Sequence, residues 1–245
     1  MLTYGIPSYK LEKDVVEAEI DVIRALGVEI KCGVEIGKDI TLDELRAQGY
    51  EAFYIAIGCQ GSRKAGVSGE DAEGVMSAVD ILHKIAENHE LDLSGRKTVV
   101  IGGGNVAVDV ARSSKRCGAD IIGMYCLESR EEMPASDEEI FETEDEGITI
   151  NNGWGLKEIL TDSGKVCGVV LKKCIAVKDE NGRFNPQYNE NETKQIACDD
   201  IYLSIGQSIV WGNMLKNENV ELGRGNGPVA DSLTYQTAQE DIFVG

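Results

Sequence analysis

Three consecutive glycines and the small residues after them have the types and spacing needed to hold a phosphate. Gly102, Gly104 and Ala107 fit the pattern G-x-G-x-x-A. The first glycine permits a sharp turn, the second lets a pyrophosphate approach the backbone, and the small third residue lets a helix and a strand pack closely. We therefore predict a dinucleotide site at this turn. Its predicted cofactor-binding residues are Gly102, Gly103, Gly104, Asn105, Val106 and Ala107.

The elements around the turn are those that the pattern requires. Four β-branched residues, Thr98 to Ile101, suit a buried parallel strand, and the apolar spacing from Asn105 predicts a helix whose first N–H groups face the phosphates. A second apolar strand is predicted near residues 121–127, and Glu128 closes it. Strand, glycine turn, helix, strand and acid together predict a Rossmann-like βαβ unit in an α/β fold. A glycine pattern alone is also typical of a ligand-free turn, so the flanking elements favour the ligand.

Composition limits the partners that this chain can have. Acidic residues outnumber basic ones by 43 to 24 among 245 residues, which gives a formal charge of −19. This balance argues against nucleic acid and against a membrane as partners, because nucleic acids and anionic lipids bind basic faces. No apolar run reaches the length of a membrane span and the N-terminus has no signal-peptide pattern, so we expect a cytoplasmic protein. Anion binding must then depend on local backbone dipoles, against an unfavourable long-range field.

The cysteines and histidines give no pattern for a metal or a disulfide. None of the seven cysteines forms a Cys-x-x-Cys pair, and their odd count and wide spacing argue against a disulfide framework, a zinc site, an iron–sulfur cluster and a redox-active dithiol. We predict that most cysteines are buried as small hydrophobic residues. His83 and His89 lie in a charged, helical stretch and are predicted to be surface residues. The cysteines are Cys32, Cys59, Cys117, Cys126, Cys167, Cys174 and Cys198.

Hydrophobic periodicity and helix caps divide the rest of the chain into short elements. Thr41 with Glu44, and Ser136 with Glu139, fit the capping-box pattern at two helix starts. Helices are predicted over residues 15–26, 41–49, 80–90 and 136–145. Strands are predicted over 28–31, 50–60, 148–151 and 199–207, with an antiparallel meander over 156–161, 165–177 and 193–198. The chain stops at Gly245 within an apolar strand, which we interpret as the sign of a fragment cut from a longer protein.

Three segments together resemble a known family. They are Gly5-Ile6-Pro7-Ser8-Tyr9-Lys10-Leu11, then Ile55-Ala56-Ile57-Gly58-Cys59-Gln60-Gly61, and the glycine turn followed by Ser129-Arg130-Glu131-Glu132-Met133-Pro134-Ala135. They are similar to motifs of the flavoproteins with two dinucleotide-binding domains, and the nearest pattern is that of the small (beta) subunit of NADPH-dependent glutamate synthase and its homologues. The resemblance spans nearly the whole chain.

The resemblance implies a domain plan. In this family a nicotinamide-binding domain is inserted into a split FAD-binding domain. Residues 1–75 then correspond to a partial FAD-binding segment, residues 76–205 to the NAD(P)-binding domain with its meander, and residues 206–245 to the return segment of the FAD-binding domain. Ile205 and Gly206 are implied to lie at the cofactors. FAD belongs to the full-length protein, and we do not expect the fragment alone to hold it.

The resemblance also implies an activity. Family members are oxidoreductases that pass a hydride from the nicotinamide to the flavin N5, so the cofactors supply the chemistry and we name no catalytic residue. An electron-acceptor subunit or domain is the implied partner, and an exposed half of a split domain can also associate with a second copy of itself. The alternative is a non-catalytic module that binds NAD(H) or another adenine nucleotide. The missing cysteine pair argues against the disulfide reductases of the superfamily.

The residues after the second strand bear on the choice between NADH and NADPH. Family members that use NADPH typically have Tyr-Arg-Arg here, whereas this chain has Tyr125-Cys126-Leu127-Glu128-Ser129-Arg130. A carboxylate at the strand end accepts hydrogen bonds from a free ribose 2′-OH and repels a 2′-phosphate. We therefore expect NAD to be favoured over NADP. Arg130 is the residue that could instead hold a 2′-phosphate, and Glu128, Ser129 and Arg130 complete the predicted binding residues.

Overall fold

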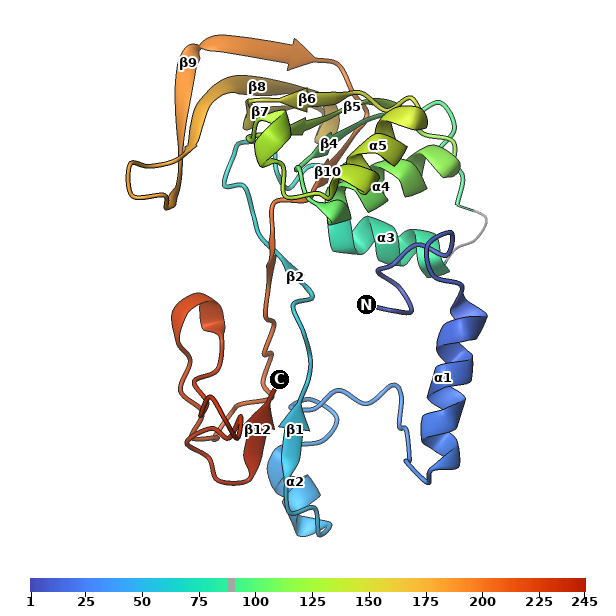
Figure 1. Ribbon diagram of the computed structural model, residues 1–245, viewed down its shortest axis with the longest axis vertical. Coiled ribbons are helices and arrows are strands. Elements are labelled where there is room, and N and C mark those ends of the chain that lie inside the picture. The colour runs from blue at the N-terminus through green and yellow to red at the C-terminus, as the bar shows by residue number, and fades with distance from the viewer. Residues whose placement is uncertain (88–90) are drawn as a thin grey trace. The chain divides into compact units, whose positions relative to one another are not determined.

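The computed structural model describes residues 1–87 and 91–245, so His89 lies outside the described residues. The chain divides into two compact units, whose elements are labelled in Figure 1. Unit 1 comprises Met1–Ala18 and Ser62–Gly206, and unit 2 comprises Glu19–Gly61 and Gln207–Gly245. Unit 1 thus includes residues that precede position 76, where the NAD(P)-binding domain is predicted to begin. The assignment of segments to a nicotinamide or an FAD domain stays a prediction.

A five-stranded parallel sheet forms the centre of unit 1. Its strands lie in the order β3 (Val75–Ser77), β10 (Asp200–Leu203), β4 (Lys97–Ile101), β5 (Asp120–Cys126) and β6 (Ile150–Asn152), and every neighbouring pair is parallel. Helices α3 (Ala78–Glu87), α4 (Asn105–Arg116) and α5 (Asp137–Asp145) pack on one face of this sheet (Figure 1). The predicted α/β fold is confirmed, and the unit β4–α4–β5 has nearly the predicted bounds.

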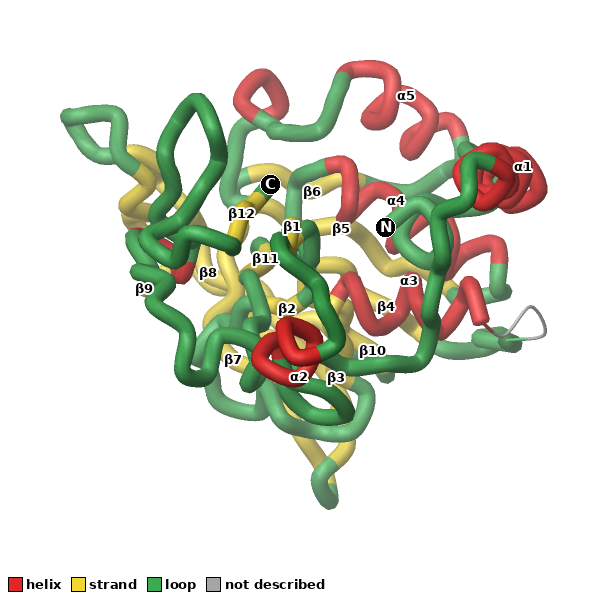
Figure 2. The backbone as a smooth tube through the Cα atoms, turned by 90° about the horizontal axis from the view of Figure 1, so that it is seen from below, coloured by secondary structure: helices red, strands yellow, loops and turns green. Residues whose placement is uncertain are grey.

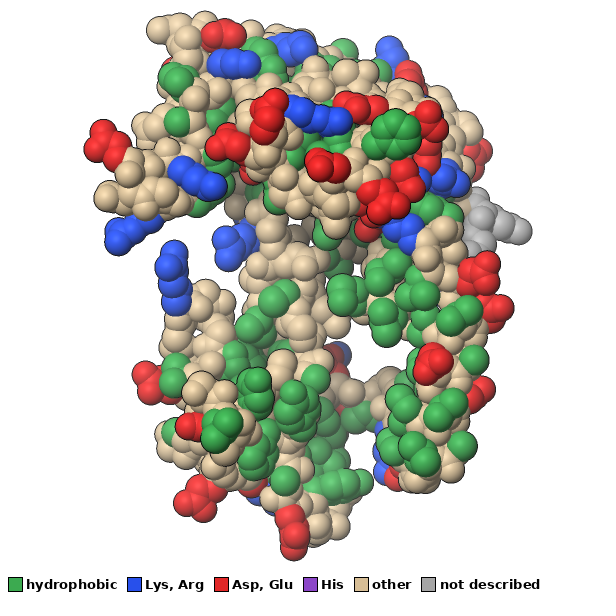
Figure 3. Space-filling model, in the orientation of Figure 1, with side chains coloured by type: hydrophobic (Ala, Val, Ile, Leu, Met, Phe, Trp, Pro, Cys, Tyr) green, Lys and Arg blue, Asp and Glu red, His purple; other side chains and the backbone are tan. Residues whose placement is uncertain are grey.

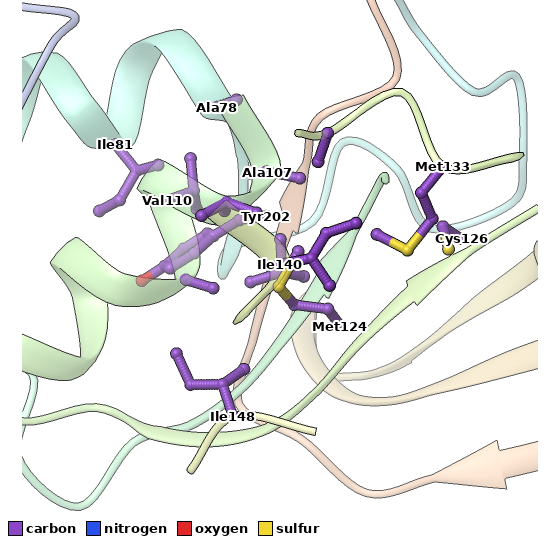
Figure 4. Close-up of a cluster of buried hydrophobic side chains, with 14 of the residues drawn as sticks. Ala78, Ile81, Ala107, Val110, Met124, Cys126, Met133, Ile140, Ile148 and Tyr202 are labelled. Carbon is purple, nitrogen blue, oxygen red and sulfur yellow. The ribbon is translucent and has the colours of Figure 1, made fainter. Parts of the chain in front are cut away.

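Side chains of the parallel strands alternate between two buried faces, as the period of a strand requires. Val100, Met124 and Tyr202 belong to the core cluster beneath the helices, part of which Figure 4 shows. Val99 and Ile201 belong to a second cluster on the opposite face. A sheet that is buried on both faces needs continuous apolar strands, and this explains the run of β-branched residues before the glycine turn.

The second face is covered by an antiparallel sheet. Its strands are β7 (Trp154–Asp162), β8 (Lys165–Lys178) and β9 (Phe184–Ile196), in that order, and Figure 2 draws the strands of both sheets in yellow. Ser163 and Gly164 join β7 to β8 with φ of 52° and 81°, which is the left-handed geometry of a two-residue hairpin. Ile159 and Val169 pack from this sheet onto the parallel one. The predicted three-stranded meander is confirmed, but its third strand begins at Phe184 and ends at Ile196 instead of spanning residues 193–198.

Unit 2 has its own small core around two parallel strands, β1 (Phe53–Ile55) and β12 (Ile242–Val244). Helix α2 (Leu42–Ala47) begins after Thr41, which forms the predicted capping box with Glu44. Leu42 packs with the apolar residues of β1 and β12. Of the strand predicted over residues 50–60, only Phe53–Ile55 forms a strand in the structure.

The remaining elements are short, and one expected strand is absent. Helix α1 (Lys13–Ala25) has the predicted period. The strand predicted over residues 28–31 is wrong, because no described strand hydrogen-bonds to this irregular stretch and its Val28 and Ile30 side chains are exposed. None of the described helices has the length and apolar character required to cross a bilayer. The other elements are β2 (Gly61–Ser62), β11 (Gln207–Ser208), and the 3-10 turns η1 (Arg130–Glu132) and η2 (Arg224–Asn226).

Candidate functional site

The glycine turn joins β4 to α4 at the carboxyl edge of the parallel sheet. The Gly102 N–H donates to the Tyr125 carbonyl of β5 at 2.8 Å. Gly102 has φ of 146°, and a Cβ on it would lie 2.4 Å from the carbonyl oxygen of Ser204, which follows β10. The turn is held so closely against the ends of both neighbouring strands that only glycine fits its first position.

The first turn of α4 is open to an anion. Gly104 is the N-cap, no described side chain caps it, and no acidic residue lies in the first turn. A Cβ on Gly104 would have no described neighbour closer than the Pro134 side chain at 3.8 Å. The first N–H groups of a helix have no acceptor within it, and the helix dipole adds positive potential at this end. Gly104 and the N–H groups of Asn105 and Val106 therefore fit a pyrophosphate.

The fully buried Ala107 lies in the core cluster beneath α4, together with Val100 of β4. A larger side chain at this position would push the helix away from the strand. The residue therefore serves to keep the helix N-terminus close to the carboxyl end of β4.

The segment after β5 packs over the glycine turn. The Ala135 N–H donates to the Gly103 carbonyl at 3.1 Å, and the Ser136 N–H donates to the Asn105 side-chain oxygen at 2.9 Å. Ser136 also caps α5 by accepting from the Glu139 N–H at 3.3 Å. The predicted second capping box is only half formed, because the Ser136 N–H is already bound and the Glu139 carboxylate pairs with a lysine near the N-terminus.

Residues near the N-terminus hold α4 and α5 from outside. Lys10 pairs with Asp109 of α4 and with Glu139 of α5, and the Arg112 guanidinium lies 5.1 Å from the centre of the Tyr9 ring.

Acidic side chains gather over α5 in Figure 3, and the sequence of this helix contains six of them. We therefore expect positive potential at the glycine turn to come from local groups, such as the N–H groups at the start of α4, rather than from a basic face.

Glu128 follows β5, and its carboxylate lies beside the glycine turn. Glu128 Oε2 is 3.0 Å from the position that a Cβ on Gly103 would occupy. The Glu128 carbonyl accepts from the Asn152 side-chain amide at 3.1 Å and from the Gly153 N–H at 3.2 Å, so the end of β6 fixes this backbone. Burial, together with the Glu128 charge, raises the pKa of the Cys126 thiol to about 12, and this thiol is neutral at pH 7.

The side chains of Ser129 and Arg130 each bind an acidic residue of the same chain. The Arg130 guanidinium pairs with Glu144 of α5 at 2.9 Å, with 41% of the arginine side chain and 48% of the glutamate side chain exposed. The Ser129 hydroxyl donates to Glu132 at 3.2 Å. Arg130 must leave Glu144 in order to bind a phosphate, and an exposed ion pair opposes this by no more than about 1 kcal/mol.

Ile205 and Gly206 lie at the same edge of the sheet, on the other side of the glycine turn. The Ser204 N–H donates to the Ile101 carbonyl at 2.7 Å, which places the chain after β10 beside the end of β4. The Gly206 carbonyl accepts from the Arg63 N–H at 3.2 Å. The predicted binding residues therefore meet at one edge, where β10 and β5 flank β4. Arg63 was not among the predicted binding residues, because it lies between the strand predicted over residues 50–60 and the helix predicted over 80–90, outside every predicted motif of the site.

The exposure of the cysteines differs from the prediction. Cys126, Cys174 and Cys198 are buried and Cys117 is partly buried, but the other three are exposed, so the prediction that most are buried is wrong. The exposed cysteines are Cys32 and Cys59, which belong to unit 2, and Cys167, which lies on β8 of unit 1. His83 is about half exposed on α3, as predicted, and the centre of its ring lies 4.5 Å from the centre of the Tyr4 ring.

Comparison with protein families and curated proteins gives consistent matches. The family model described as pyridine nucleotide-disulphide oxidoreductase matches residues 3–245. The chain is 33% identical to the NADP(+)-dependent formate dehydrogenase subunit beta of Moorella thermoacetica, with all of this chain and 35% of the relative covered. It is 30% identical to the glutamate synthase (NADPH) small chain of Escherichia coli, with all of this chain and 55% of the relative covered. The chain thus spans between a third and just over half of these relatives.

Solved structures agree with this fold. FprA of Mycobacterium tuberculosis, determined in complex with NADPH, matches with a TM-score of 0.77 and 18% identity over 99% of this chain and 68% of that one. The thioredoxin reductase of T. acidophilum matches with a TM-score of 0.57 and 21% identity over 79% of this chain and 56% of that one. At these identities the similarity establishes the fold.

Proposed function

Because this chain belongs to the pyridine nucleotide-disulphide oxidoreductase family, we propose that it binds a nicotinamide adenine dinucleotide at the glycine turn and, within a longer protein, presents it to FAD. The observation that supports this most directly is that the first turn of α4 is open. The turn that leads into it begins at position 102, which only glycine fits. A rigid backbone cradle of this kind suits a pyrophosphate.

In this proposal, each group of residues at the carboxyl edge of the parallel sheet has a separate role. The N–H groups of Asn105 and Val106 bind the pyrophosphate, and Glu128 lies on the adenosine side, at the end of β5. Ile205 and Gly206 lie on the nicotinamide side, after β10. Residues 76–205 are then the nicotinamide domain, and residues 1–75 and 206–245 are parts of the FAD-binding domain.

The chemistry in this proposal belongs to the cofactors. When both are bound, the reduced nicotinamide supplies a hydride and the flavin accepts it. This chain's residues bind and orient the nucleotide, and we propose no acid, base or nucleophile among them. Several relatives are named as subunits or chains, such as subunit beta and small chain, so we propose that a further subunit or domain takes the electrons.

We further propose that the site favours NADH. Two observations support this: the Glu128 carboxylate lies beside the glycine turn, as an acceptor for a ribose 2′-OH would, and Arg130 is engaged by Glu144. The names of the relatives favour the opposite choice, because they refer to NADP(+) or NADPH. The arrangement of Glu128 and Arg130 and the names of the relatives thus predict opposite preferences, and binding experiments distinguish them.

The test is a calorimetric titration of this chain with NADH and with NADPH in one buffer, followed by flavin reduction in the longer protein. Tighter binding of NADH supports Glu128 as the residue that reads the 2′ position. Tighter binding of NADPH retains the site and transfers this role to Arg130. If neither nucleotide binds, the glycine turn is not a nucleotide site in this chain. Binding without flavin reduction contradicts the oxidoreductase role and favours a nucleotide-binding module.

A further inference from the structure

Arg63 differs from most arginines of this chain because none of the described acidic residues pairs with it. Six of the nine arginines form ion pairs, whereas no described carboxylate pairs with the exposed Arg63 side chain. Arg183 and Arg224 also lack such a pair among the described residues, but Arg183 lies in the β8–β9 hairpin and Arg224 lies in unit 2. In a chain with a formal charge of −19, a guanidinium with no partner among the described carboxylates is available to an anion.

The position of Arg63 is fixed from two directions. Its N–H donates to the Gly206 carbonyl at 3.2 Å. Its side chain lies along Gly206, with Cδ 3.3 Å and Nε 3.7 Å from the position that a Cβ on Gly206 would occupy. Gly206 follows Ser204, whose carbonyl presses against Gly102 of the glycine turn. Arg63 is therefore held at the β10 side of the turn.

This side is opposite to the one that Glu128 occupies. Strands β10 and β5 flank β4 in the sheet, so Arg63 and Glu128 lie on opposite sides of the turn. Adjacent strands are about 5 Å apart, and an arginine side chain spans that distance. A dinucleotide with its adenosine ribose at Glu128 runs across the turn toward β10 and brings its second phosphate toward Arg63.

We propose that Arg63 binds the nicotinamide-side phosphate of the pyrophosphate, and that it therefore contributes to binding of NADH and NADPH alike. This inference rests on the proposed function of the same site. A guanidinium presents a planar pair of donors that matches phosphate oxygens, which an unpaired lysine would not reproduce. Arg63 complements the N–H groups of α4, which approach the pyrophosphate from the other direction.

Lys64 offers a matched control. It is exposed and adjacent in sequence, but its ammonium pairs with Asp71 at 2.6 Å. The variants R63Q and K64Q each remove one positive charge from the same loop. A general electrostatic contribution of this loop predicts equal effects of the two variants, whereas a specific phosphate contact predicts an effect of R63Q alone.

The experiment measures binding of NADH, ADP-ribose and AMP to the wild-type chain and to R63Q, R63K and K64Q by calorimetry. ADP-ribose retains both phosphates, and AMP lacks the one on the nicotinamide side. We expect R63Q to weaken the binding of NADH and of ADP-ribose by roughly tenfold, and R63K to recover part of this loss. The affinity of R63Q for AMP should differ from that of the wild type by less than about twofold. K64Q is expected to match the wild type, and thermal unfolding of R63Q confirms that the variant is folded.

Each other outcome contradicts a different part of the argument. If R63Q binds NADH as tightly as the wild type, the inference about Arg63 is wrong and the nucleotide site remains. An equal loss for R63Q and K64Q shows a general charge effect and also overturns the inference. A tenfold loss of AMP binding in R63Q places Arg63 on the adenosine half, against the proposed orientation. If the wild-type chain binds neither NADH nor ADP-ribose, the proposed function fails together with this inference.

Discussion

The substitution Glu128→Gln tests the proposal that Glu128 reads the 2′ position of an adenosine ribose. The change keeps the shape of the side chain and its capacity to accept a hydrogen bond, and it removes one negative charge. Glu128 Oε2 is 3.0 Å from the Cβ position of Gly103, so a ribose that follows a pyrophosphate at this turn lies close to the carboxylate.

The expected magnitude follows from the charges. Two unit charges at about 5 Å repel by about 3 kcal/mol if the effective dielectric constant is about 20. Because Glu128 is only partly buried, solvent screening lowers this repulsion to about 1–2 kcal/mol, or roughly 5- to 30-fold in the Kd of NADPH. A hydrogen bond to a neutral amide is about 1 kcal/mol weaker than one to a carboxylate, so NADH binding should weaken by about fivefold.

Parallel titrations of the wild type and E128Q with NADH and NADPH measure both effects. We expect the ratio of the two Kd values to shift by at least about tenfold toward NADPH, and to shift less in high salt. Glu131→Gln, which removes an exposed charge three positions along the same loop, should leave the ratio unchanged. An unchanged ratio in E128Q, or an equal shift in E131Q, would refute the assignment of Glu128.

Three further predictions concern the framework of the two units. Gly102→Ala should lower the free energy of unfolding in urea by at least about 2 kcal/mol and weaken NADH binding, because φ is 146° and the new Cβ would meet Ser204; unchanged stability would contradict this geometry. Ser136→Ala should lower stability by about 1 kcal/mol through loss of the α5 cap, whereas Ser136→Asp should not. The Arg46 guanidinium lowers the pKa of Asp241, so this carboxylate contributes stability that is present above its ordinary pKa of 3.8 and is lost as the pH falls below that value. Asp241→Asn should therefore flatten the acid limb of stability against pH, and an unchanged limb would show that the pair contributes nothing.

The sequence predicts the β4–α4–β5 unit well because its signals are local. The β-branched run before Gly102, the glycine spacing and the helical period after Asn105 each specify a conformation within a few residues. The hairpin at Ser163 and Gly164 is specified in the same way, since Gly164 adopts the left-handed backbone of the turn without steric cost. These elements do not depend on distant parts of the chain.

Other features depend on neighbours that are remote in sequence, and the sequence predicts them poorly. Val28 and Ile30 have strand-like types, but no described strand pairs with them. The Glu139 carboxylate could complete its capping box, but Lys10, far away in sequence, binds it instead. Arg63 lies near the glycine turn only because β10 lies beside β4, which the order of strands along the chain does not reveal.

The acidic composition and the proposed anionic ligand are compatible because the relevant fields have different ranges. The charge of −19 is distributed over the chain and repels a dinucleotide at long range. At physiological salt the Debye length is about 8 Å, so most of this repulsion is screened. In the proposed site, the N–H groups at the start of α4 and the Arg63 guanidinium act at contact distance, where salt screens them much less. The proposal therefore relies on an open helix N-terminus and on one guanidinium with no partner among the described carboxylates, and it needs no basic face.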